Sequence, residues 1–301
     1  LALLAGLILA VSLPGAALAS LIIPNLTSRQ RRIALAMLIT GLAALITGGP
    51  FLLDDGFPAQ PPASAASLSA QNTALLALPN PSQPGEYAVR TLTYGSGNGR
   101  RLEYAAQAAL LTPPADGSQL LSGWSALRRA YWGFGPEAMP LNARVWYPAG
   151  EGPFPLILIV HGNHPMEDPS ENGYSYLAEL LASRGFIAAS IDENFLNLSL
   201  AADFALAAPL KDENDARAWL ILEHLRQWRT WSQTPGNPFS GKVNFDEVGL
   251  IGHSRGGEAI AIAAAFNRLP CHPENAALRF DYNFNIRALA AIAPVDGQFT
   301  P

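Results

Sequence analysis

Hydrophobic and polar positions divide the 301-residue chain into three parts, of which the first is almost entirely apolar. Residues 1–24 carry no charge, and a second uncharged stretch covers residues 33–53. A helix of about 20 apolar residues is long enough to cross a hydrocarbon core. Neither stretch shows the polar stripe of a helix that packs on a soluble core. The pattern therefore predicts a hairpin of two transmembrane helices joined by a short basic loop over residues 1–55.

The charges around these stretches predict an orientation. Arg29, Arg31 and Arg32 lie between the two stretches, and the next basic residue is Arg90. Positive charge near membrane ends favours the cytoplasmic side, so the rest of the chain is expected outside the cytoplasm. The small-residue run AALAS also fits a signal-peptide cleavage site, although a cleaved signal does not account for the second stretch.

Residues 56–85 are rich in Pro, Ala, Ser and Gln, the composition of a linker with little regular structure. From residue 86 onward the pattern alternates between strands and helices. Strands are predicted at 87–95, 142–148, 155–162, 186–194, 247–254 and 286–297. Helices are predicted at 174–185, 212–231 and 255–268, the second with Asp212 as its N-cap. This alternation predicts an α/β domain over residues 86–301, with a mostly parallel sheet and helices on both faces.

The segment GHSRG marks the point where one predicted strand becomes a helix. Gly252-x-Ser254-x-Gly256 is the pattern of a nucleophile elbow, in which a serine occupies a strained strand-to-helix turn. Ligands of open α/β sheets bind beyond the carboxyl ends of the strands, where Ser254 is predicted to lie. The alternative interpretation is a turn serine that only caps the following helix.

Acyl transfer by a serine also needs hydrogen-bond donors for the developing oxyanion. One is the N–H after the nucleophile, that of Arg255, and the second is expected in the loop after the strand at 155–162. Asn163 is the candidate there and His164 the alternative. His161 and His164 raise the alternative of a metal pair, but no third ligand at suitable spacing accompanies them. Neither a metal nor a cofactor is therefore expected.

The composition excludes some partners. The net charge of −5 gives no basic footprint for nucleic acid. The single cysteine, Cys271, excludes an internal disulfide and a thiolate metal site. The expected partners are a membrane and a small-molecule or lipid-like ester.

Four segments in order resemble the α/β-hydrolase superfamily: ARVWYPAGEGPFPLILIVHGN, LAELLASRGFIAASIDEN, SGKVNFDEVGLIGHSRGGEA and ALAAIAPVDG. The nearest branch holds platelet-activating-factor acetylhydrolase-like, cutinase-like polyester hydrolase and chlorophyllase-like enzymes. The resemblance covers most of residues 142–297. It implies that Ser254 is the nucleophile, that Asn163 and Arg255 form the oxyanion hole, and that DENFLN at 192–197 lines the pocket.

The sequence departs from that superfamily at its end. There the acid and the histidine follow the serine, on loops after the last strands. The chain stops at Pro301 after what the resemblance implies is the sixth of eight strands, so the sheet is expected to be incomplete and the triad to continue beyond it. Asp296 is the candidate acid within the chain. His272 is expected on a loop away from the serine.

These observations predict a membrane-anchored serine hydrolase that cleaves a carboxylic ester through an acyl-enzyme on Ser254. An acyltransferase that uses the same serine and a non-catalytic hydrolase-like binding domain are the alternatives. The aromatic stretch 120–142 is expected to pack against the early strands, with Arg128 and Arg129 solvated, and a flap or an interaction surface is the other interpretation.

Overall fold

The computed structural model describes residues 2–22, 26–53, 80–97, 100–205 and 210–295. The chain forms two compact units, Leu1–Leu78 and Pro79–Pro301. The predicted linker falls mostly on residues 54–79, which lie outside the described residues. Its last part, 80–85, is held against the second unit, because Arg184 donates to the Gln83 carbonyl at 2.6 Å and the Gly85 N–H donates to the Ser183 hydroxyl at 2.8 Å.

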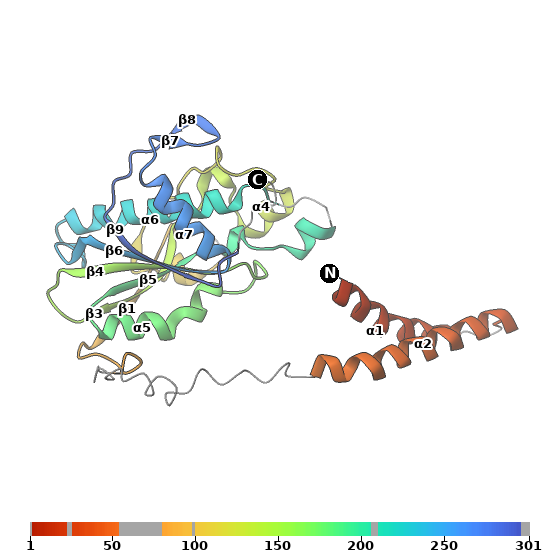
Figure 1. Ribbon diagram of the computed structural model, residues 1–301. Helices are drawn as coiled ribbons and strands as arrows, with labels where there is room; N and C mark the ends of the chain where they lie inside the picture. Colours follow the sequence, from red (N-terminus) through yellow and green to blue (C-terminus); the bar gives the residue numbers. More distant parts are fainter. Residues whose placement is uncertain (1, 23–25, 54–79, 98–99, 206–209, 296–301) are drawn as a thin grey trace, which may run out of the picture. The chain divides into compact units, whose positions relative to one another are not determined.

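The first unit consists of helices α1 (Ala2–Leu21) and α2 (Ser28–Leu53), which fold back on one another (Figure 1). They approach closely where a Cβ on Gly41 would lie 2.3 Å from Pro14 Cδ. A capping box begins α2: the Gln30 side chain accepts the Thr27 N–H at 3.0 Å, and the Thr27 hydroxyl accepts the Gln30 N–H at 3.3 Å. The basic residues predicted for the loop therefore lie within the first turns of α2.

The membrane prediction for this unit is only partly supported. In the part of the chain that the structure describes, one helix is long and apolar enough to cross a membrane, Ser28–Thr47, with a mean hydropathy of 1.3. Ser12–Leu21 is a shorter apolar segment. The predicted transmembrane hairpin is therefore not confirmed. Ile39 and Ile46 of α2 are 62% and 73% exposed, which is unusual for large apolar side chains of a helix packed within a soluble core.

The second unit is built on a sheet with the strand order β2-β1-β3-β5-β4-β6-β9. Strands β5, β4, β6 and β9 are mutually parallel, and β3 is antiparallel to both β1 and β5. The prediction of an α/β fold with a mostly parallel sheet is confirmed. The strands are β1 (Val89–Gly95), β2 (Leu110–Leu111), β3 (Asn142–Pro148), β4 (Phe154–Val160), β5 (Ile187–Asp192), β6 (Val243–His253) and β9 (Ile286–Ile292), with β7 (Cys271–His272) and β8 (Asn275–Arg279) in a separate hairpin.

Helices cover both faces of this sheet (Figure 1). Along β4 the side chains alternate: Leu156 and Leu158 pack in the core with α6 and α7, whereas Ile157 and Ile159 pack with α5. A strand buried on both faces needs a continuous apolar run, as the sequence of β4 has. The helices are α4 (Ala126–Trp132), α5 (Ser175–Ser183), α6 (Glu213–Gln233) and α7 (Arg255–Phe266), with short turns η1 (Leu102–Tyr104), η2 (Pro136–Ala138), η3 (Ser170–Tyr174), η4 (Asn194–Leu196) and η5 (Leu200–Ala205).

Two local predictions need correction. Asp212 occupies the N-cap position of α6 as predicted, but it has φ 62° and its side chain makes no cap bond. Arg128 is buried rather than solvated, with 1% exposed, because its guanidinium donates to the Phe195 and Asn197 carbonyls at 2.7 and 2.9 Å. It also pairs with Asp203.

The aromatic stretch 120–142 packs largely as expected. Trp132 and Phe134 are buried in the core, and their rings contact each other and that of Phe195. Arg129 is exposed and pairs with Glu137. This stretch therefore contributes to the hydrophobic core of the second unit.

Candidate active site

Ser254 forms the turn that joins β6 to α7. Its φ of 55° and ψ of −119° are a sparsely populated backbone conformation for a residue with a side chain, and such strain costs of order 1–3 kcal/mol. The Ser254 N–H donates to the Ile292 carbonyl at 3.0 Å. The Ser254 carbonyl accepts the N–H groups of Gly257 and Val295 at 2.9 and 3.3 Å. The turn therefore has the backbone form of a nucleophile elbow.

Two glycines allow the close packing of this turn. A Cβ on Gly252 would lie 2.1 Å from the carbonyl oxygen of Gly256, and a Cβ on Gly256 would lie 2.4 Å from that of Val160 in β4. Real Cβ atoms essentially never approach a heavy atom within 3.0 Å. Helix α7 can lie directly on strands β6 and β4 only because both positions are glycine. This packing accounts for the Gly-x-Ser-x-Gly spacing.

The loop after β4 lies against the same turn, since a Cβ on Gly162 would be 2.9 Å from Ser254 Cβ. Asn163 Oδ1 accepts the Leu198 N–H at 2.8 Å, and Met166 N–H donates to the Leu198 carbonyl at 2.8 Å. These bonds tie the loop to the segment that follows η4. Asn163 directly follows Gly162, the residue that contacts Ser254.

Arg255 is the first residue of α7. The first N–H groups of a helix have no acceptor within that helix, and they carry the positive end of its dipole. The Arg255 side chain forms an ion pair with Glu213 at the start of α6. The backbone N–H groups of Arg255 and Asn163 remain the predicted oxyanion donors.

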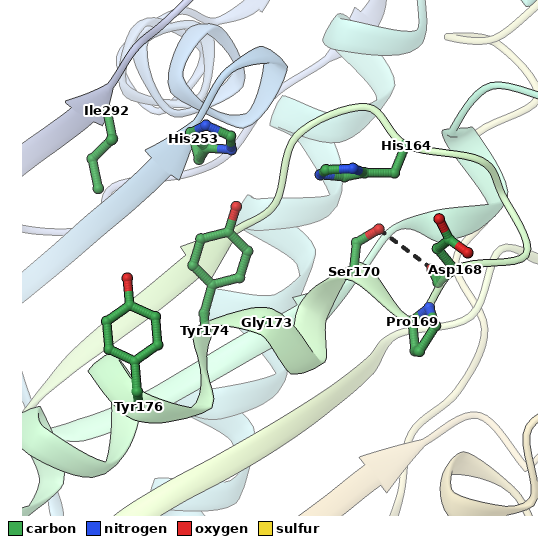
Figure 2. Close-up of a pocket in the computed structure, with 9 residues that line it drawn as sticks. All are labelled: His164, Asp168, Pro169, Ser170, Gly173, Tyr174, Tyr176, His253 and Ile292. Carbon is green, nitrogen blue, oxygen red and sulfur yellow. Dashed lines mark hydrogen bonds between the residues drawn. The ribbon is translucent and has the colours of Figure 1, made fainter. Parts of the chain in front are cut away.

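A cavity of about 540 Å³ opens beside the turn (Figure 2). This volume lies within the range of roughly 300–1,000 Å³ typical of small-molecule sites. Its walls come from the loop after β4, from η3 and the start of α5, and from the ends of β6 and β9. The lining residues are His164, Asp168, Pro169, Ser170, Gly173, Tyr174, Tyr176, His253 and Ile292. The lining combines Pro169, Ile292 and two tyrosines with two histidines, a serine and an aspartate, so the cavity offers an organic ligand both apolar contact and hydrogen-bonding groups.

His161, the first residue after β4, is fully buried. Its Nε2 accepts the Glu193 N–H at 3.0 Å, so its Nδ1 carries the hydrogen and donates to the Gly162 carbonyl at 2.8 Å. Burial and the Arg217 charge lower the pKa of His161 to about 3. His161 is therefore a neutral structural link between the loops after β4 and β5, and it is not free to ligate a metal.

A buried charged cluster holds η3, and with it one wall of the cavity. Glu171 is fully buried. Its carboxylate accepts hydrogen bonds from Arg101 at 3.0 Å, from the Tyr104 hydroxyl at 2.7 Å and from the Asn194 amide at 2.7 Å. Burial opposes ionisation, but the Arg101 guanidinium outweighs it and lowers the pKa of Glu171. Helix η3, which carries part of the wall, is thus held in place by Glu171 and its three partners, which all lie outside η3.

A second buried pair joins α6 to the loop after β5. Arg217 and Glu193 are both fully buried, with Arg217 Nη1 3.4 Å from Glu193 Oε2. Arg217 Nη2 also donates to Asn197 Oδ1 at 2.7 Å. Burial raises the pKa of Glu193 to about 8, although Arg217 acts in the opposite direction. Glu193 therefore binds its proton more tightly than an exposed glutamate does.

The structure brings together only some of the residues that the sequence singled out. Ser254, Arg255 and Asn163 gather at one end of the sheet, whereas Asp296 lies outside the described residues. The segment 192–197 is not among the residues that line the cavity described above, and its Asp192 and Asn194 are buried in the charged cluster. That this segment lines the substrate pocket stays a prediction. His272 pairs with Asp215 at 3.0 Å. Among the described residues, no three metal-ligating side chains gather.

The parts of the cavity wall that sequence reasoning missed are Tyr174, Tyr176 and the 168–170 segment. The only signal for them was position, since they lie between a strand end and the next helix. That region of an α/β domain commonly faces the site. The charged cluster gave no signal, because Arg101 and Glu171 are far apart in sequence.

The parallel sheet, the strained serine turn and the cavity beyond the strand ends define an α/β hydrolase-like protein. The family model named Chlorophyllase matches residues 135–300, and the chain belongs to that family. The family is one of α/β-hydrolase-like proteins, and membership indicates an enzyme that hydrolyses esters. No curated protein matches the chain.

Proposed function

We propose that the protein is a serine esterase in which Ser254 attacks the ester carbonyl. The hydroxyl adds to the carbonyl carbon, the alcohol leaves, and water then hydrolyses the acyl-enzyme. The N–H groups of Arg255 and Asn163 are the donors for the oxyanion that forms at each addition step. The triad histidine and acid remain to be assigned.

The observation that carries this proposal is the backbone of Ser254. A residue that merely caps a helix takes an extended backbone and bonds the helix through its side chain. Ser254 instead has φ 55° and makes no side-chain cap bond. Ser254 therefore keeps a strained backbone although its side chain makes no capping bond, so helix capping does not account for the strain.

Three of the five histidines are engaged elsewhere: His161 with backbone groups, His224 with the Tyr94 hydroxyl at 2.7 Å, and His272 with Asp215. The other two, His164 and His253, line the cavity. The proposal keeps the expectation that a histidine from a later strand completes the triad, as the superfamily order implies.

A fluorophosphonate probe tests the proposal on the protein expressed from its complete reading frame. Wild type should react covalently and hydrolyse a p-nitrophenyl ester, whereas Ser254→Ala should do neither. Ser240→Ala, in the turn before β6, serves as the matched control and should react as wild type does. Equal labelling of wild type and Ser254→Ala would remove the basis of the esterase proposal, and so would the absence of labelling in both.

The same assay separates the two alternatives. An acyltransferase would label at Ser254 and pass the acyl group to an added alcohol faster than to water. A non-catalytic binding domain would not label at all, and its cavity would only bind ligands.

The proposal includes attachment to a membrane through α1 and α2, with the hydrolase unit outside the cytoplasm. It is supported by the exposed apolar side chains of α2 and by the basic residues at the start of that helix. A lipid-like ester is the substrate that such an anchor would favour. Extraction of the protein from membranes by alkaline carbonate would contradict the attachment. Activity of a reporter that functions only in the cytoplasm, fused after Leu53, would contradict the outward placement.

A further inference from the structure

Three residues that line the cavity in Figure 2, His164, His253 and Ile292, are linked to the proposed nucleophile or to the loop that contacts it. His253 immediately precedes Ser254, and the carbonyl of Ile292 accepts the Ser254 N–H. His164 immediately follows Asn163 on the loop that contacts Ser254. An ester bound with its carbonyl at Ser254 therefore extends one of its two ends into this cavity.

Tyr174 is the residue of the cavity wall with the most direct route to Ser254. Its ring lies 6.3 Å, centroid to centroid, from that of His253, and its hydroxyl points toward His253 (Figure 2). Burial raises the pKa of Tyr174, and the backbone N–H of Gly162 acts in the opposite direction. Gly162 is the residue that contacts Ser254 Cβ.

A phenol oxygen accepts hydrogen bonds and has one hydrogen to donate. The hydrogen of the Tyr174 phenol is therefore available to an acceptor. Among the described residues, no acceptor takes it. A half-buried donor without an acceptor, at the wall of a cavity, is arranged to bond a ligand.

The position of Tyr174 is fixed before any ligand binds. It is the last residue of η3, whose Glu171 is fully buried and held by Arg101 and Asn194. Donors that are already oriented lose little entropy on binding. By contrast, Tyr176 on the same wall is 71% exposed.

We propose that Tyr174 is a substrate-contacting residue whose hydroxyl donates a hydrogen bond to an oxygen of the ester bound at Ser254. The inference rests on the proposed function. It specifies the substrate further: the part that enters the cavity is uncharged and carries an acceptor oxygen close to the scissile bond. Among the described residues that line the cavity there is one carboxylate, Asp168, and no lysine or arginine, so the cavity disfavours an anionic group.

The test compares Tyr174→Phe with Tyr131→Phe in the full-length protein, using p-nitrophenyl butanoate as the probe. Tyr131 lies on α4 away from the cavity and stacks under Arg100, so its variant is a matched loss of one hydroxyl. Losing one neutral hydrogen bond should lower kcat/KM about two- to tenfold in Tyr174→Phe. Tyr131→Phe should keep the wild-type value.

A second measurement keeps the Tyr174 hydroxyl in place. With 3-fluorotyrosine at position 174, the fluorine resonance should shift when phenylboronic acid occupies Ser254, and it should not shift in the Ser254→Ala background. A Tyr174→Phe enzyme with the wild-type kcat/KM, or an unchanged fluorine resonance on boronate binding, would overturn the assignment of Tyr174. Either result leaves the esterase proposal standing if wild type still labels at Ser254, so the two failures are distinguishable.

Discussion

Replacing Gly252 by alanine tests whether this glycine is needed for the close packing at the serine turn. The added Cβ would lie 2.1 Å from Gly256 O, 2.4 Å from Gly256 C and 2.7 Å from Gly257 N. All three are backbone atoms, so no side-chain rotation relieves the overlap. Helix α7 and strand β6 must separate by nearly 1 Å before the closest contact reaches 3.0 Å.

Overpacking of this kind costs about 1–3 kcal/mol, which corresponds to a fall in Tm of roughly 2–12 °C for a domain of this size. The displacement also moves Ser254 relative to the loop at Asn163. Misplacing a reacting group by about 1 Å can lower the rate roughly 100-fold. The expected result is therefore a modest loss of stability with a much larger loss of esterase activity.

The matched control is Gly249→Ala, three residues earlier on β6. A Cβ there would lie 3.4 Å from Ile157 Cγ1, which is an ordinary contact. Calorimetry gives the two Tm values, and p-nitrophenyl ester hydrolysis gives the two rates. If Gly252→Ala keeps the Tm and activity of wild type, or if both variants lose them equally, the packing argument is refuted.

Two further predictions concern buried groups. Glu171→Ala removes the carboxylate that accepts hydrogen bonds from Arg101, Tyr104 and Asn194, although Arg101 keeps its ion pairs with Glu103 and Asp192. Leaving the buried Tyr104 hydroxyl and Asn194 amide without this acceptor should lower the free energy of unfolding by about 1–3 kcal/mol, measured by urea denaturation. Glu137→Ala, at an exposed ion pair, should stay near wild type, and equal losses in the two would contradict the reasoning. Burial lowers the pKa of His224 from 6.5 to about 3, so the unfolded chain takes up the proton first as the pH falls below 6.5. The stability advantage of wild type over His224→Gln should shrink by about 2–3 kcal/mol between pH 7 and pH 4.5, and a constant difference would show that His224 does not titrate in this way.

The second unit could be predicted from sequence where burial imposes a pattern. The run PLILIV became β4, because a strand packed on both faces must be apolar at every position. The glycines around Ser254 marked the turn, because only glycine tolerates the approach of α7 to β4. Both signals are local and arise from a constraint that a single segment of sequence must satisfy.

The rest of the site could not be predicted for the same reason. The bond from Arg101 to Glu171 joins residues 70 positions apart, and nothing in either segment specifies the other. Asp212 is at the predicted N-cap position, but the chain enters α6 with φ 62° there and the side chain makes no bond to the helix amides. In contrast, Thr27 and Gln30 do carry a recognisable capping box that sequence reasoning passed over, which placed the start of α2 too late.

The anchoring of η3 has a practical consequence for truncation. The family match begins at residue 135, yet Arg101 and Tyr104, which neutralise and bond Glu171, come before it, as does β1, which pairs along β3. A fragment cut at residue 135 would take away the Arg101 and Tyr104 partners of the buried Glu171, leaving it Arg144 at 3.5 Å and the Asn194 amide. It would also turn β3 into an unprotected edge strand. An expression clone of the catalytic unit alone should therefore start near Pro79, and a shorter one is expected to aggregate.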